Sequence, residues 1–167
     1  IMTYLGVDQW DCKHNQIGLA YSKSPDGPWI KFDQNPLISY DRTDRWGVGQ
    51  STSVVLDDQT IRLFYNKNGT MVARDIKLCD LEHIDPGEEK LIPNIRPNAY
   101  FSYSEQSVYV VSEMRINMSA EIPTWVGNYA RIAFQPVEDD MFSEKDQWKE
   151  IGYVGPDDSG FPRNHNP

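Results

Sequence analysis

The sequence predicts an all-β fold: a β-propeller of four-stranded antiparallel blades, of which this chain forms an incomplete part of about three blades. One strand pattern recurs about every 50–60 residues, and Ala20, Ala73 and Ala133 stand at equivalent positions in its three copies. Each copy has an alternating strand, a polar turn and a short final strand. No helical period extends beyond a couple of turns, so a βαβ fold is not expected. Stranded repeats of this length are typical of blades, because a single blade cannot bury its own apolar surface.

The first blade is expected over residues 1–32 of a single, partial propeller domain that spans residues 1–167. Residues 1–7 and 16–22 alternate as strands and are separated by a polar loop. The run Ser24-Pro25-Asp26-Gly27-Pro28 is a strong turn signal, because Pro presets φ and Gly accepts a positive φ. Trp29 to Phe32 then follow as a short outer strand.

The second blade is expected over residues 50–84. Residues 51–56 are β-branched and apolar, which predicts a buried inner strand. Residues 60–65 and 70–76 follow after tight turns, and residues 81–84 close the blade.

The third blade is expected over residues 96–154, and residues 160–167 are expected to begin a further blade. Only residues 137–145 could hold a helical turn. Trp148 stands at the position equivalent to Trp29, and both are predicted to pack inside the fold. The expected strands of this blade are 96–103, 107–114, 128–134 and 148–151.

The charge of the chain argues against nucleic-acid partners, and its hydropathy argues against a membrane partner. The formal net charge is −9, the pI is about 4.7, and no cluster of Lys and Arg occurs. Such a chain repels phosphate backbones. No apolar stretch approaches the ~18–20 residues of a membrane span. Aromatic residues make up 12% of the chain, which suits sugar-stacking surfaces, so a carbohydrate is the expected ligand.

The remaining motifs predict no metal and no cofactor. His14 and His83 lack partners at metal-ligand spacing, and no Gly-rich phosphate loop is present. Cys12 and Cys79 either pair with one another or stay ordinary thiols. Two Asn-X-Ser/Thr triplets, which begin at Asn68 and Asn117, favour a secreted or periplasmic location.

Three segments resemble a known family. Gly18–Trp29 (GLAYSKSPDGPW) resembles the third-to-fourth-strand signature of five-bladed β-propeller glycoside hydrolases, namely the arabinofuranosidase and β-xylosidase group of family 43 and its relatives in families 32, 62, 117 and 130. Residues 49–55 with 61–65, and residues 95–100 with 108–113, are similar to the openings of the next two blades. The resemblance implies a glycoside hydrolase that acts on oligo- or polysaccharides. A whole domain of this family is about twice this length, so we expect the remaining blades of a longer chain, or self-association, to cover the open blade faces.

The resemblance also implies three axial carboxylates: an Asp as base or nucleophile, a second Asp that orients, and a Glu as general acid. In this chain, Ser51 and Thr52 stand where an Asp-Pro pair is expected, and Arg96-Pro97 stands where Glu-Pro is expected. The catalytic acids therefore lie outside this chain, or the protein is a divergent member. The alternative function is a non-catalytic, glycan-binding propeller. A third reading is a repeat scaffold for protein contacts.

Three carboxylates within the chain are candidate catalytic groups. Glu113 ends an apolar strand and could face the axis as the acid, or pair with Arg115. Asp8 follows the first strand and is either a first-blade carboxylate or a turn residue. Asp44 either reaches over the mouth of the site or is a solvated loop charge.

Other residues are candidates for sugar binding. Trp46 and Trp125 lie in polar loops, where an apolar ring is either a stacking platform or packs on the loop itself. Arg96 and Asn98 either contact a ligand at the axis or bond to buried loops. The C-terminal run offers several sugar-competent groups, unless it is an ordinary loop. The predicted substrate-binding residues are Trp46, Gln50, Ser51, Arg96, Asn98, Trp125, Arg163, Asn164 and His165.

Overall fold

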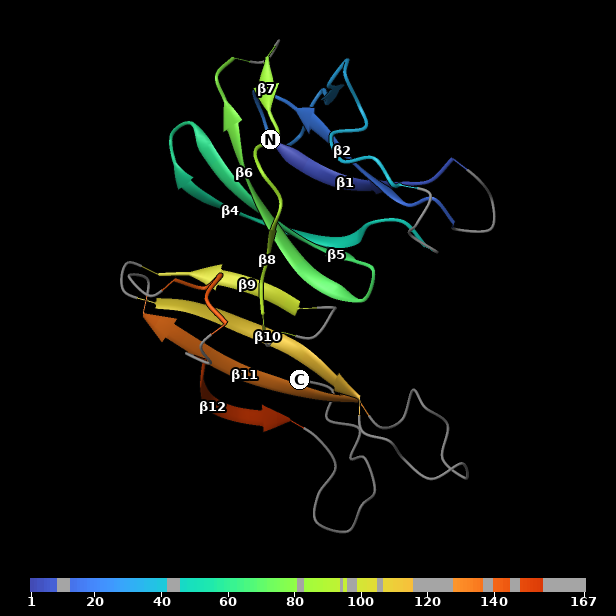
Figure 1. Cartoon of the computed structure of the whole chain (residues 1–167). Helices are drawn as coiled ribbons and strands as arrows, with labels where there is room; N and C mark the ends of the chain where they lie inside the picture. Colours follow the sequence, from blue (N-terminus) through green and yellow to red (C-terminus); the bar gives the residue numbers. More distant parts are fainter. Residues whose placement is uncertain are drawn as a thin grey trace.

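The computed structural model describes residues 1–8, 13–41, 46–80, 83–93, 95, 99–104, 107–115, 128–136, 140–144 and 148–154. It describes the backbone alone of residues 50, 111–115, 128–132, 150 and 152–154. These ranges form antiparallel strands and no helix, so the all-β prediction is confirmed for the described part of the chain (Figure 1). Within it, no helix is long and apolar enough to cross a membrane.

The first sheet contains three strands in the order of the sequence: β1 (Met2–Gly6), β2 (Gln16–Tyr21) and β3 (Ile30–Lys31). β1 pairs with β2 from Met2 opposite Ala20 to Gly6 opposite Gln16. These strands occur where the sequence predicts them.

The second sheet follows the same meander. Its strands are β4 (Gly49–Asp57), β5 (Thr60–Lys67), β6 (Thr70–Leu78) and β7 (Ile84–Asp85), in that order. β8 (Lys90–Leu91), which lies between the predicted second and third blades, pairs with β6 beside β7. Asn68 and Gly69 connect β5 to β6 with φ of 50° and 75°. Positive φ at both central residues is the requirement of a type I′ hairpin, which Asn-Gly satisfies best.

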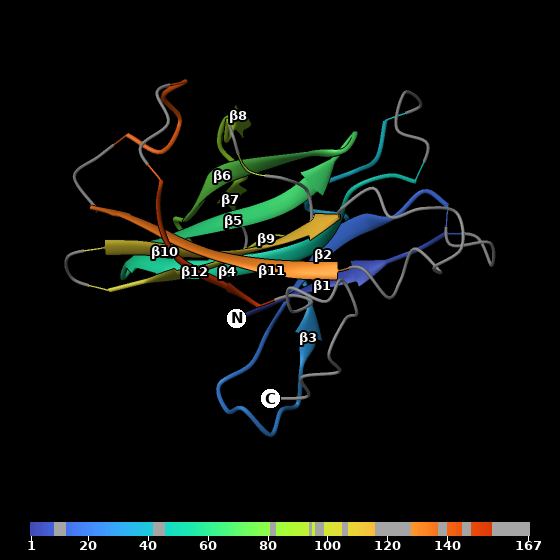
Figure 2. The same cartoon turned by 90° about the horizontal axis from the view of Figure 1, so that it is seen from below.

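The third sheet contains β9 (Ala99–Tyr103), β10 (Ser107–Arg115), β11 (Asn128–Pro136) and β12 (Lys149–Val154), in the order β12-β11-β10-β9. Residues 140–144 form turns, and the predicted helical turn is not seen there. Between sheets, β4 contacts both β1 and β9. Figures 1 and 2 show that the arrows of β4 and β9 point the same way, so both strands begin at one edge of the molecule.

Two apolar cores lie on opposite faces of the second sheet. Successive side chains of β5 point alternately into one core and into the other. Leu63 and Tyr65 point toward the first sheet, whereas Phe64 points toward the third. The core against the first sheet consists of Ile17, Ile38, Val48, Ile61, Leu63, Tyr65, Val72 and Ile76. The second sheet is thus covered on both faces, as expected of a stacked blade.

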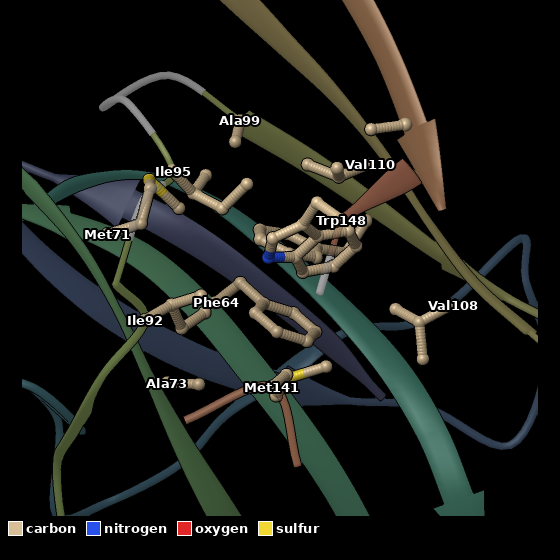
Figure 3. Packing of buried hydrophobic residues seen from close by; sticks show 12 residues of the cluster. Phe64, Met71, Ala73, Ile92, Ile95, Ala99, Val108, Val110, Met141 and Trp148 are labelled. Carbon is tan, nitrogen blue, oxygen red and sulfur yellow. The ribbon is translucent and has the colours of Figure 1, made fainter. Parts of the chain in front are cut away.

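The core between the second and third sheets is aromatic at its centre. The ring of Phe64 stacks on Phe101, with 4.0 Å between centroids and 9° between planes. Trp148 meets Phe101 edge-on at 6.2 Å. Figure 3 shows Phe64, on β5, and Trp148, just before β12, reaching into the same space. Trp148 is 7% exposed, which confirms its predicted packing role.

Two burial predictions were wrong. The strand at residues 51–56 was predicted to be buried, yet Val55 is 74% exposed. β4 is an edge strand of its sheet, so it pairs with a strand on one side only, β5. Its other contacts with described strands are mainly with β1 and β9. Trp29 was predicted to pack like Trp148, yet it is 40% exposed, because it precedes β3, the outer edge strand whose two residues are both exposed.

Candidate functional site

The described candidate residues gather at one edge of the molecule. We call it the strand-start edge, defined by the end of β1, the starts of β2, β4, β9 and β11, and the end of β10. Gly6 pairs with Gln16 there, and Asn15 forms a parallel bridge with Gly47, just before β4. In the third sheet, Ser112 pairs with Ala99. The shared direction of β4 and β9 brings the two groups of strand ends to the same side (Figure 1).

The structure places five of the predicted site residues at or beside this edge. Asp8 follows β1, and Trp46 precedes β4 and is 53% exposed. Ser51 lies near the start of β4 and is partly exposed. The backbones of Gln50 and Glu113 lie near the start of β4 and the end of β10. Asp44, Arg96, Asn98, Trp125, Arg163, Asn164 and His165 lie outside the described residues.

His14 forms a polar and aromatic cluster at the strand-start edge, which the sequence analysis missed. Its Nδ1 lies 3.2 Å from Asp8 Oδ1 and 3.4 Å from Oδ2. Its ring stacks on Tyr40, with centroids 4.1 Å apart and planes 5° from parallel. The sequence predicts no metal-ligand partner for His14, and the metal-ligand pattern does not include its contact with Asp8. The position of His14 in a loop six residues after Asp8 is the one signal that could have suggested the pair.

The backbone of this cluster is anchored to the start of the second sheet. The amide of Asn15 donates to the Trp46 carbonyl at 3.0 Å, and the amide of Val48 donates to the Asn15 carbonyl at 2.9 Å. Gly47, with φ of 79°, lies so close to the Asn15 backbone that a Cβ would collide with it. These contacts place the backbone of Trp46 beside His14.

A second polar cluster joins β5 and β6 to the segment before β8. Its members are Tyr65, Lys67, Arg74 and Glu89, and each of these side chains has a hydrogen-bond partner within the cluster. The buried hydroxyl of Tyr65 donates to Glu89 at 2.5 Å and accepts from Arg74 at 2.8 Å. Lys67 donates to Glu89 at 3.0 Å. Burial, together with the bond to Glu89, raises the pKa of Tyr65. Burial opposes ionisation of Glu89, but the hydrogen bonds from Tyr65 and Lys67 outweigh it and lower its pKa. The bonding of each member indicates a structural role.

A hollow of about 160 Å³ lies over β1 and β2, on the face of the first sheet opposite the core that this sheet shares with the second sheet. Its polar lining includes Asn35, whose amide nitrogen donates to Tyr4 Oη at 3.2 Å and to the Leu19 carbonyl at 2.9 Å. The Asn35 side-chain oxygen accepts from the Leu19 amide at 2.8 Å. Asn35 therefore ties its loop to β2.

Neither a metal site nor a disulfide is seen in the described part of the chain. No group of three or more His, Cys, Asp or Glu side chains could hold a metal ion there. Cys79 is an exposed, free thiol.

Comparisons with known proteins support the fold. No protein-family model matches the chain, and no curated protein matches its sequence. The structure is similar to that of an α-L-arabinofuranosidase from Clostridium thermocellum ATCC 27405, with a TM-score of 0.54 and 16% sequence identity. The match covers 92% of this chain and 49% of the arabinofuranosidase, so the chain spans about half the length of that protein. At this identity the likeness shows the fold, an arrangement of antiparallel sheets like half of a family 43 propeller.

Proposed function

We propose that the protein is carbohydrate-active and hydrolyses glycosidic bonds of oligo- or polysaccharides. This chain would supply about three blades of a five-bladed propeller, over residues 1–32, 50–84 and 96–154, with a further blade beginning at 160–167. The observation that carries the proposal is the structural likeness to half of an arabinofuranosidase. The strand-start edge would then form part of the mouth of the axial site.

The chemistry of the strand-start edge suits a neutral sugar. Trp46 is 53% exposed, and an exposed aromatic face can stack against the apolar face of a sugar ring. The cluster around His14 adds hydrogen-bonding groups beside it. The net charge of −9 disfavours strongly anionic ligands.

Hydrolysis requires two carboxyl groups that flank the scissile bond. Glu113, Asp44 and Asp8 are the proposed candidates within this chain. Glu113 lies near the end of β10 in the third sheet and Asp8 follows β1 of the first sheet, so the backbones of the two residues lie along the edge at different sheets. One would protonate the leaving oxygen while another activates water or attacks the anomeric carbon. Gln50, Ser51, Arg96, Asn98, Trp125, Arg163, Asn164 and His165 are proposed to contact the sugar together with Trp46.

A non-catalytic, glycan-binding propeller is the second candidate function. Ser51 and Thr52 occupy the start of β4, the inner-strand position at which the resemblance implies an Asp. Neither side chain can serve as the carboxylate base. A site with sugar-binding groups and no complete set of acids would bind glycans without cleaving them.

An assay of the purified protein against aryl glycosides and neutral oligosaccharides tests both candidates. We expect turnover that falls by about 10²–10⁴-fold in Glu113→Gln, the range for loss of an acid–base group. Trp46→Ala should raise KM, whereas Trp29→Ala is the matched control, because Trp29 is also exposed but lies beyond the opposite end of β2. Binding without turnover would establish the second candidate. Neither binding nor turnover by folded protein would refute both.

A further inference from the structure

We propose that His14 is a sugar-binding residue of the strand-start edge, that its Nε2 accepts a hydrogen bond from a hydroxyl of a neutral saccharide, and that Asp8 is its positioning residue. This inference rests on the proposed function and deepens it, because it names a subsite and moves Asp8 out of the set of candidate acids.

The contact with Asp8 decides which nitrogen of His14 carries the proton. Nδ1 faces the carboxylate at 3.2 and 3.4 Å, and an ionised carboxylate only accepts hydrogen bonds. Nδ1 is therefore the donor, and neutral His14 keeps Nε2 as an acceptor. Within the described part of the chain, Nδ1 is the ring nitrogen that has a partner. Nε2 is separated from Nδ1 by one ring carbon, Cε1, and the side chain is 27% exposed.

Stacking and backbone contacts hold the ring of His14 in place. The parallel stack on Tyr40 at 4.1 Å leaves the ring little freedom to tilt. His14 has φ of 58°, a left-handed conformation that is uncommon for a residue other than glycine. The bonds of Asn15 to Trp46 and Val48 hold the chain in this conformation. A side chain that is already ordered loses less entropy when it binds a ligand.

A second Asp–His pair in the same chain, Asp80 and His83, is more exposed and local in sequence. His83 Nδ1 lies 3.3 Å from Asp80, but the two side chains are 77% and 59% exposed and only three residues apart. No ring stacks on His83 among the described residues. This pair therefore offers a matched control for His14 and Asp8.

The neighbourhood of His14 favours a neutral, hydroxyl-rich ligand. The carboxylate of Asp8 repels an anionic sugar, and a neutral imidazole acceptor takes an O–H donor. The Trp46 backbone is bonded to Asn15, the residue after His14, so an exposed indole and the imidazole acceptor belong to one edge. Stacking on one group and hydrogen bonding to the other is a suitable combination for a single sugar ring.

The imidazole ¹⁵N signals of the intact protein test the geometry. The chain has three histidines, so His14→Gln and His83→Gln assign the signals. We expect His14 to be protonated at Nδ1, and we expect saturation with arabinotriose or xylotriose to shift its Nε2 signal and leave His83 unchanged. Asp8→Ala should alter the tautomer of His14, and Asp8→Asn, whose side-chain oxygen still accepts, should retain it. A wild-type His14 protonated at Nε2 would overturn the inference.

The affinity for the same trisaccharides, measured by tryptophan fluorescence, tests the role of His14 in sugar binding. His14→Ala should weaken binding about five- to tenfold, as for one lost hydrogen bond, and His83→Ala should leave it unchanged. Binding that depends on Trp46 but not on His14 would overturn this inference and leave the proposed function intact. No binding of either trisaccharide or the wider panel by folded protein would overturn the proposed function as well. Loss of kcat without a change in KM in Asp8→Asn would identify Asp8 as a catalytic acid instead.

Discussion

Tyr4 and Gly18 show how one residue's size matters in the first sheet. The two residues are cross-strand partners in β1 and β2, and the Tyr4 ring covers Gly18 so closely that a Cβ there would lie 2.8 Å from Cε2. The Tyr4 hydroxyl accepts a hydrogen bond from Asn35, which limits how far the ring can move away. Gly18 is therefore required by the close approach of the ring.

Gly18→Ala should lower the free energy of unfolding by about 1–3 kcal/mol, the usual cost of overpacking. Urea unfolding followed by circular dichroism measures it. Gly6→Ala is the matched control on β1, because a Cβ there would meet Tyr4 at 4.0 Å, an ordinary contact. Equal costs for both substitutions would show that the Tyr4 ring is not the reason.

Charged side chains fasten neighbouring elements together. Arg62 on β5 donates to Asp75 on β6 at 2.6 and 2.8 Å and to Tyr103 on β9 at 3.1 Å, so it joins the second and third sheets. The hydrogen bonds from Arg62 lower the pKa of Asp75. Glu89 joins the segment before β8 to Tyr65 and Lys67 on β5, and its pKa is also lowered.

A lowered pKa in the folded state gives these carboxylates a defined pH dependence. Their contribution to the free energy of unfolding is complete above the pKa values of the unfolded chain, 3.8 for Asp75 and 4.5 for Glu89. It is lost as the pH falls through the lower pKa values of the folded state. Stability should therefore drop in that acid range, and less steeply in Asp75→Asn and Glu89→Gln, which are already less stable at neutral pH. Urea unfolding across pH measures both. Asp58→Asn, in the exposed β4–β5 turn, should keep the wild-type profile.

At the scale of the whole molecule, the second sheet is shared by two cores. Leu63 and Phe64 are adjacent and fully buried, but they belong to opposite faces of β5. Loss of either side chain should weaken one neighbouring sheet more than the other.

Leu63→Ala should cost about 2–5 kcal/mol and Phe64→Ala about 3–5 kcal/mol. Val55→Thr, at a 74% exposed position, should stay within about 0.5 kcal/mol. Amide hydrogen exchange should rise in β1 and β2 for Leu63→Ala and in β9 and β10 for Phe64→Ala. The same pattern of exchange in both variants would contradict the two-core arrangement.

The sequence by itself determined the longer strands and the all-β class. Period-two alternation, the Asn68-Gly69 turn and the recurrence of the strand pattern are local signals, and local signals suffice for hairpins. The placement of Asp8, Trp46 and Ser51 beside strand ends follows from the same reasoning, since strand ends can be read from the chain. The catalytic role of Asp8 and the sugar-binding roles of Trp46 and Ser51 stay predictions.

Only the tertiary structure decided which surfaces are covered and which side chains meet. The exposure of Val55 and Trp29 depends on whether another sheet lies over them, and the alternation of a strand does not contain that information. The stack of His14 on Tyr40 joins residues from two different loops. The two loops are held together where Ile38, two residues before Tyr40, forms an antiparallel bridge with Ile17, three residues after His14. No local pattern specifies this contact between distant parts of the chain.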